Sequence, residues 1–137
     1  MEVVFLKAKK PLAKEISEQG IKPYPLTKNF TSEHFDVSTT QKGLNKLYKL
    51  LTDQAAAGAC LHKGLLKRPL KDEPRAFMSE RANTTEMLVL DVDGLHTTNP
   101  GDLQALADKI ILQLPEVFHN VSYIAQASAS LGFKKNT

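Results

Sequence analysis

Residues 87–94 read Met-Leu-Val-Leu-Asp-Val-Asp-Gly, an apolar run that ends in two aspartates and a glycine. Four consecutive apolar residues without polar alternation are typical of a strand covered on both faces. A helical pattern follows this run, and residues 121–127 form a second apolar segment. Strand, helix and strand in this order predict a βαβ unit with a right-handed connection, both strands lying in one sheet.

The helix between these two strands has recognisable ends in the sequence. Asn99 is a suitable N-cap, Pro100 fits the first turn, and Pro115 ends the pattern. The apolar stripe in between consists of Leu103, Leu106, Ile110 and Leu114.

The first half of the chain predicts further elements. Residues 3–6 form a short apolar strand, and residues 9–20 form a helix closed by a glycine. Residues 21–40 contain two prolines and few periodic apolar positions, so we expect a long connection. A second helix runs from a cap at Thr39 or Thr40 to about residue 57, with Leu44, Leu47, Tyr48 and Leu51 on its core stripe, and residues 59–61 start a strand. These elements predict an α/β fold with a mixed sheet and flanking helices.

Composition and charge narrow the class of protein. The chain has 137 residues, 42% of them apolar and 24% charged, which predicts one domain over residues 1–137. Residues 1–71 hold thirteen basic and six acidic side chains, an excess that suits a phosphate backbone as partner. The single cysteine, Cys60, excludes a disulfide framework, and its apolar neighbourhood predicts a core thiol. The sequence offers no membrane span and no export signal, so we expect a cytoplasmic protein.

Asp91 and Asp93 are the strongest chemical signal. Residues i and i+2 at the end of a strand project to the same face, so two like charges come close together. A divalent cation relieves their repulsion, and carboxylate oxygens favour Mg²⁺ or Mn²⁺ over zinc. The alternative is a simple turn, because Asp and Gly are common turn residues. A turn does not require Asp91, which directly follows an apolar run where an unpaired carboxylate is costly.

Several other side chains are candidates for binding phosphate or template. Ser128 and Ser130 follow the second predicted strand, and both strand exits lie at one edge of a parallel sheet. Arg81 offers a guanidinium that matches phosphate oxygens. Lys63 lies in the basic stretch that begins at His62. Solvated serines and an unliganded basic loop are the alternatives for these residues, and we expect satisfied or exposed side chains at His34, His96 and His119.

Residues 88–94, preceded by Ser79-Glu80-Arg81-Ala82 and followed by Gln126-Ala127-Ser128-Ala129-Ser130, resemble the archaeo-eukaryotic primase superfamily. The nearer likeness is to the primase-polymerases of phages and plasmids. In that family an apolar strand ends in an Asp-x-Asp metal motif, which Asp91 and Asp93 match. A later serine-containing segment leads into a strand with a nucleotide-contacting histidine, and Ser128 and Ser130 match only its approach. The likeness covers about residues 79–132.

The resemblance implies an RRM-like catalytic core in which Asp91 and Asp93 bind two divalent cations, Mg²⁺ or Mn²⁺. One cation would activate the primer 3′ hydroxyl and the other would bind the nucleoside triphosphate, with single-stranded DNA as template. The family's histidine and third acid would lie beyond residue 137. We therefore expect the chain to be the front portion of the core, to bind metal weakly and not to polymerise alone. A helicase domain or partner downstream is compatible with this interpretation.

Two alternatives remain open. Asp-x-Asp-Gly after an apolar strand also resembles the first motif of haloacid-dehalogenase-like phosphatases. That family has threonine or valine where Leu95 stands, and its first motif normally opens the domain, whereas 90 residues precede Asp91. The second alternative is a non-catalytic nucleic-acid-binding module, in which the basic half binds phosphates and the aspartates only shape a turn.

Overall fold

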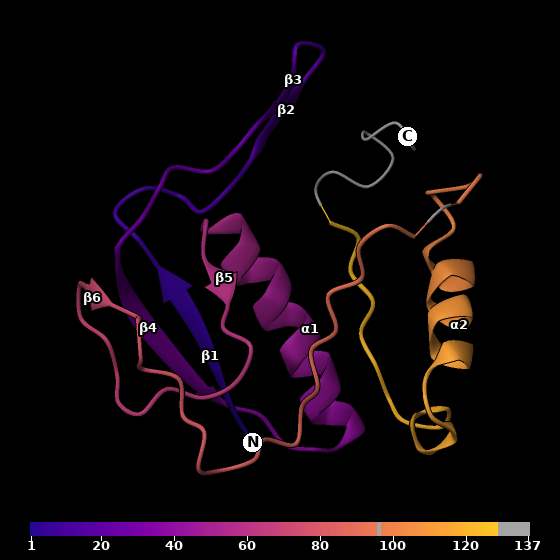
Figure 1. Cartoon of the computed structure of the whole chain (residues 1–137). Coiled ribbons are helices and arrows are strands. Elements are labelled where there is room, and N and C mark those ends of the chain that lie inside the picture. Colours follow the sequence, from indigo (N-terminus) through magenta and orange to yellow (C-terminus); the bar gives the residue numbers. More distant parts are fainter. Residues whose placement is uncertain (96, 129–137) are drawn as a thin grey trace. The chain divides into compact units, whose positions relative to one another are not determined.

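The computed structural model describes residues 1–95 and 97–128, and the chain divides into two compact units, Met1–Leu90 and Asp91–Thr137 (Figure 1). The first unit contains a four-stranded sheet, a two-stranded hairpin and the longer helix. In chain order its elements are β1 (Glu2–Lys7), β2 (Glu15–Ser17), β3 (Gly20–Lys22), β4 (Asn29–Asp36), α1 (Gln41–Ala56), β5 (Cys60–Leu61) and β6 (Glu73–Pro74). The second unit contains α2 (Leu103–Gln113) and the 3-10 turn η1 (Glu116–Phe118).

The four-stranded sheet has the order β5-β1-β4-β6, and all neighbouring strands are antiparallel. Strand β1 pairs with β4 over six residues, from Glu2↔Asp36 to Lys7↔Thr31. Because β4 and β5 are both antiparallel to β1, they run parallel to each other, and α1 is the crossover between them. The first unit therefore contains a βαβ unit whose two strands are separated by β1.

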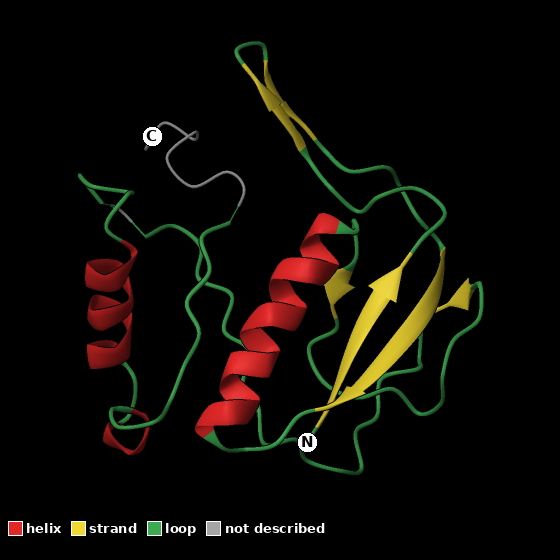
Figure 2. Cartoon of the chain, turned by 180° about the vertical axis from the view of Figure 1, so that it is seen from behind, coloured by secondary structure: helices red, strands yellow, loops and turns green. Residues whose placement is uncertain are grey.

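Strand β1 forms the centre of the first unit. Its four apolar residues, Val3 to Leu6, are at most 2% exposed. Helix α1 packs against one sheet face, where Gln54 Nε2 donates to Glu33 Oε2 at 3.0 Å (Figure 2). On the other face Leu6 packs with Phe30 and Leu70 in a second apolar cluster. The strand predicted for residues 3–6 is therefore confirmed, and its continuous apolar run is buried because both of its faces are covered.

Helix α1 confirms the predicted boundaries. The Thr40 hydroxyl accepts a hydrogen bond from Gly43 N at 3.3 Å, and the helix ends before Gly58, whose φ of +76° suits glycine. Its buried residues are Gly43, Leu47 and Gln54. Tyr48, which we expected on the core stripe, is 62% exposed because the buried stripe passes through the Gly43 side of the helix instead.

The prediction of a helix over residues 9–20 is wrong. This segment contains β2, which pairs with β3 in a hairpin where Ile16 faces Ile21. Near the start of the segment, the backbone N–H of Leu12 donates to Gly58 O at 2.8 Å, a long-range hydrogen bond instead of a helical one. Gly20 has a φ of +126°, a value that fits the turn of a hairpin.

The long connection predicted over residues 21–40 is also wrong in part, since it contains the eight-residue strand β4. The sequence of β4 lacks a clear alternation of apolar and polar residues. Its strand conformation comes from the ladder with β1, which supplies six residue pairs. Tertiary pairing here overrides a weak local signal.

Two further predicted strands, residues 87–90 and 121–127, are absent from the described part of the chain. A strand requires a hydrogen-bonded neighbour, and neither segment has a ladder among the described residues. Leu88 is 62% exposed and Leu90 is 48% exposed, so the run is not covered on both faces. The sheet is accordingly antiparallel rather than mixed, and the βαβ unit lies in the first half of the chain.

Helix α2 is confirmed, but with a different cap. Asp102, not Asn99, is the N-cap, and its Oδ1 accepts a hydrogen bond from Ala105 N at 3.0 Å. Asn99 belongs to the preceding turn, where its carbonyl accepts from Asp102 N at 3.2 Å. Leu106 is buried in this unit, and Gln104 Nε2 donates to the Tyr123 hydroxyl at 2.8 Å, joining α2 to the segment that follows it.

The coarse architecture is thus a small mixed α/β protein with a four-stranded antiparallel sheet and two α-helices among the described residues. Neither of those helices has the length and apolar character required to cross a bilayer. That residues 1–137 belong to a single, incomplete catalytic domain stays a prediction.

Residues 65–80 form the cover of the second sheet face, and side chains of β4 fasten it. Ser32 Oγ accepts a hydrogen bond from Leu70 N at 2.8 Å, while Ser32 N donates to Leu70 O at 3.0 Å. Thr31 Oγ1 accepts from Asp72 N at 3.1 Å in an exposed position. These bonds hold Leu70, which is 2% exposed, over Leu6 and Phe30.

We predict that Gly43→Ala destabilises the first unit, although alanine normally favours helices by roughly 1 kcal/mol over glycine. A Cβ at this position would lie 1.6 Å from Ser38 O, so the helix start would have to move. We expect a net loss of about 1–3 kcal/mol in the free energy of unfolding, as for overpacked cores. Urea denaturation measures it. The exposed Asn45→Ala in the same helix is the control; equal or higher stability of Gly43→Ala would contradict the packing described here.

We also predict that Ser32→Ala lowers the free energy of unfolding by about 1–3 kcal/mol, because it leaves a part-buried N–H without its acceptor. Thr31→Ala is the matched control, since it removes the same type of bond one residue earlier at an exposed site. Thermal unfolding of both variants compares them. Equal losses would show that the Ser32 bond does not fasten the cover.

Candidate metal and phosphate site

Asp91 and Asp93 lie at the start of the second unit, immediately after the apolar run that ends at Leu90. Both residues are exposed. Gly94 follows with a φ of +70°, so the chain turns just beyond the pair through a conformation that side chains disfavour. The chain therefore bends directly after the two exposed carboxylates.

The remaining predicted site residues come from other segments. Lys63 and Arg81 are exposed residues of the first unit, and Ser128 is an exposed residue of the second. Ser130 lies outside the described residues. Asp91 and Asp93 are held near each other by their covalent spacing, and among the described residues the two strands whose ends were to gather the serines beside them are not formed.

The basic stretch after β5 begins with a buried residue, His62, and continues with an exposed one, Lys63. His62 is 8% exposed, and its backbone N donates to Val4 O at 2.9 Å, which continues the pairing with β1. Burial lowers the pKa of the His62 imidazole, and a hydrogen bond to the Leu65 backbone opposes that change. The His62 Nε2 atom is buried without a hydrogen-bond partner in the described structure. Lys63, the next residue, is exposed.

Cys60 differs from its prediction. We expected a buried core thiol, but the residue is exposed at the short strand β5, the outermost strand on one side of the sheet. Partial desolvation raises the pKa of the Cys60 thiol, and the charge of Arg75 opposes this change. A raised pKa disfavours the nucleophilic thiolate form of this side chain.

A serine, a histidine and a glutamate meet on the sheet face opposite α1. Ser32 Oγ lies 2.7 Å from His34 Nε2, and His34 Nδ1 lies 2.5 Å from Glu2 Oε1. This is the atom order of a hydrolase triad. The Ser32 oxygen, however, already accepts the Leu70 N–H, and the cover segment packs beside it. We assign this network to fastening the cover, and His34 is a satisfied histidine, as predicted.

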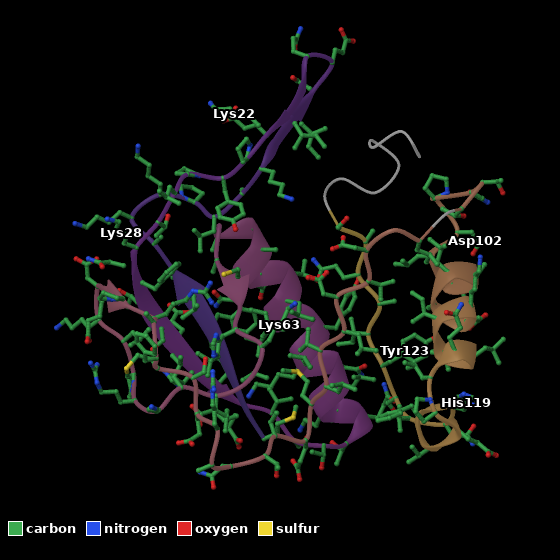
Figure 3. The ribbon with its side chains drawn as sticks, in the orientation of Figure 1. Lys22, Lys28, Lys63, Asp102, His119 and Tyr123 are labelled. Carbon is green, nitrogen blue, oxygen red and sulfur yellow. The ribbon has the colours of Figure 1, made fainter. Side chains whose placement is uncertain are left out.

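His119 is likewise satisfied, because its Nε2 lies 2.8 Å from the Leu114 carbonyl oxygen (Figure 3). His96 lies outside the described residues. His34 and His119 thus both have hydrogen-bond partners, in line with the prediction of satisfied or exposed side chains.

The donor set at Asp91 and Asp93 matches Mg²⁺ or Mn²⁺ in kind, since both ions prefer carboxylate and water oxygens. The two aspartates provide few ligands, because across residues 1–95 and 97–128 no group of three His, Cys, Asp or Glu side chains is placed to hold a metal. Two carboxylates alone leave most of an octahedral shell to water or to ligand oxygens. Such a pair suits an ion that arrives with a phosphate ligand.

No protein-family model, no curated protein and no solved structure matches this chain. A function for the site must therefore be argued from the residues and their geometry.

We predict that the buried His62 makes the first unit less stable in weak acid. The folded state holds the His62 pKa below its ordinary value, so only the unfolded chain takes up a proton as the pH first falls past about 6.5. The stability linked to His62 is therefore complete above pH 6.5 and is lost as the pH falls through the lowered folded-state pKa.

Urea denaturation between pH 7.5 and 5.5 measures this dependence in the wild type and in His62→Leu. The variant removes the titrating group and should show a flatter profile, whereas His119→Gln in the second unit should keep the slope. Parallel profiles for the wild type and His62→Leu would contradict the assignment of the titration to His62.

Proposed function

We propose that this chain carries the metal-binding part of a nucleotidyltransferase site, which extends DNA on a single-stranded template as a primase-polymerase does. The observation that carries the proposal is the exposed pair Asp91 and Asp93, one residue apart, between an apolar run and the left-handed turn at Gly94. Its likeness to the Asp-x-Asp motif of the archaeo-eukaryotic primase superfamily supports the same conclusion.

Asp91 and Asp93 would hold Mg²⁺ or Mn²⁺ through their carboxylate oxygens. When bound, the ions supply positive charge to the triphosphate and lower the pKa of the primer 3′ hydroxyl. The two side chains provide negative charge at a fixed spacing, and their exposure leaves room for the triphosphate oxygens. No heavy atom beyond the chain neighbours of Gly94 lies within 4 Å of the position of a Cβ at this glycine.

The other candidates have supporting parts in this proposal. Arg81 and Lys63 are exposed cations that suit phosphates of the nucleotide or template, and Ser128 offers a hydroxyl for the same purpose. Ser130, which lies outside the described residues, is proposed to bind phosphate or template as the sequence predicts. The RRM-like arrangement expected of a primase core belongs to the proposal as well.

The charge distribution supports a nucleic acid as partner. Thirteen basic and six acidic side chains lie in residues 1–71, all within the first unit. An excess of this size attracts the phosphate backbone and accelerates its association. A single-stranded DNA template and nucleoside triphosphates are therefore the proposed partners, in the cytoplasm.

The test compares nucleotide incorporation on single-stranded DNA with Mn²⁺ by the natural gene product and by its Asp91→Asn/Asp93→Asn variant. We expect the variant to lose activity by at least about a hundredfold, because neutral amides bind the cations weakly. Asp108→Asn is the matched control, since Asp108 is also an exposed aspartate of the second unit, and it should retain activity.

Incorporation that is equal in the wild type and in the double variant would contradict the proposed role of the aspartates. No incorporation by the folded wild type, together with release of phosphate from small phosphoesters that depends on Asp91, would replace the proposal with the phosphatase alternative. Salt-sensitive DNA binding without either activity would favour the non-catalytic module.

A further inference from the structure

Residues 9–28, which we call the basic arm, extend from the sheet of the first unit. The hairpin of β2 and β3 stands away from the four-stranded sheet in both views (Figures 1 and 2). At its base Leu12 N donates to Gly58 O at 2.8 Å, and Pro11 fills the space beside Gly58, where a Cβ would lie 2.7 Å from the Pro11 Cβ. The arm is therefore anchored at one end to the end of α1, and at the other it continues into β4.

The arm has more positive charge than its own contacts neutralise. It holds five lysines and two glutamates. Lys22 pairs with Glu15 at 3.3 Å and Lys9 with Asp72 at 3.7 Å, but these lysines are 73% and 87% exposed, so water screens both pairs. The remaining lysines of the arm make no ion pair with described residues; they are Lys10, Lys14 and Lys28.

An exposed aromatic ring lies among these lysines. The sequence from Lys22 to Lys28 is Lys-Pro-Tyr-Pro-Leu-Thr-Lys, and Tyr24 is 52% exposed. The prolines on both sides restrict the backbone next to Tyr24, which lowers the entropy cost of ordering this segment on a ligand. Figure 3 shows Lys22 and Lys28 directed outward from the ribbon on either side of this segment.

An exposed aromatic side chain between cations is the combination that binds single-stranded nucleic acid. The lysines contact phosphates, and the ring stacks on an unpaired base, whose flat face duplex DNA conceals. A protein partner that recognises proline-rich segments would bind Pro23 and Pro25 in an aromatic-lined groove, a mode that does not require the charge of Lys10, Lys14 and Lys28. The unneutralised charge therefore favours the nucleic acid.

We propose that the basic arm is a binding site for single-stranded DNA, in which Tyr24 stacks on a base and Lys14, Lys22 and Lys28 contact the backbone. This inference deepens the proposed function, on which its biological meaning rests, by assigning the template contact to a segment that the sequence predicted as a helix and a plain connection.

Fluorescence anisotropy of a labelled twelve-nucleotide oligothymidine at low salt, with EDTA present, tests the arm without involving the metal site. Tyr24→Ala should weaken binding roughly tenfold through the loss of one stacked base, and Tyr24→Phe should restore most of it. Tyr48→Ala is the matched control, because Tyr48 is 62% exposed on α1 outside the arm, and it should bind as the wild type does.

Two further measurements separate stacking from charge. Tyr24→Ala should bind duplex DNA of the same length as well as the wild type does, since duplex bases are already stacked. Lys28→Ala should reduce the slope of log affinity against log salt by about 0.7, whereas Lys42→Ala on α1 should leave it unchanged.

Equal affinities of Tyr24→Ala and Tyr48→Ala for the oligonucleotide would overturn the proposal, as would undetectable binding by the folded wild type. Equal weakening on single-stranded and duplex DNA would also overturn it, because it would exclude stacking. None of these results depends on Asp91 and Asp93, so the proposed metal-dependent activity is judged separately by its own variants.

Discussion

The burial of β1 on both faces is the constraint on which the first unit depends. Val3, Val4, Phe5 and Leu6 are nearly inaccessible to solvent, and each such side chain contributes about 1.5–3 kcal/mol of burial free energy. One layer cannot cover a strand whose residues point alternately to both sides. Helix α1 therefore covers one face, and the segment after β5 covers the other, held by Ser32 and Leu70.

The same constraint explains the topology. Strand β1 takes hydrogen bonds on both edges, from β4 on one side and β5 on the other, so both partners run antiparallel to it. Helix α1, which joins β4 to β5, must therefore cross β1. Near the end of this helix Gln54 donates a hydrogen bond to Glu33 of β4, and Lys7 of β1 donates to the same carboxylate. The hydrogen bond from Lys7 holds the pKa of Glu33 below its ordinary value, as expected for a carboxylate retained in its charged form.

Local patterns predicted the elements that carry their own signal. Residues 3–6 are a continuous apolar run, and α1 has a threonine cap, a periodic stripe and a terminating glycine. Strand β4 has no such signal and forms because β1 offers a ladder, which sequence spacing does not reveal. The apolar run at residues 87–90 shows the converse: it has strand composition but no ladder among the described residues. A hydrophobic run indicates that a segment can form a strand, but a hydrogen-bonded neighbouring strand determines whether it does.

The sequence could predict only the part of the candidate site whose residues are close together along the chain. Asp91 and Asp93 are neighbours by covalent spacing, and Gly94 bends the chain after them with a positive φ. The gathering of Ser128 beside them was inferred from two parallel strands that the described residues do not form, so it stays a prediction without that scaffold. The basic arm was missed because residues 9–20 match a short helical stripe, whereas the pairing of β2 with β3, including Ile16↔Ile21, is a contact that the stripe does not reveal. An exposed tyrosine between two prolines and flanking lysines was the signal available.

The most direct test of the central claim, that Asp91 and Asp93 form a metal site, is a titration of ¹⁵N-labelled protein with substoichiometric Mn²⁺, followed by NMR. Paramagnetic broadening should begin at the amides of residues 90–94 and should disappear there in Asp91→Asn/Asp93→Asn. Broadening that starts at other carboxylates, or that persists unchanged at residues 90–94 in the variant, would contradict the account.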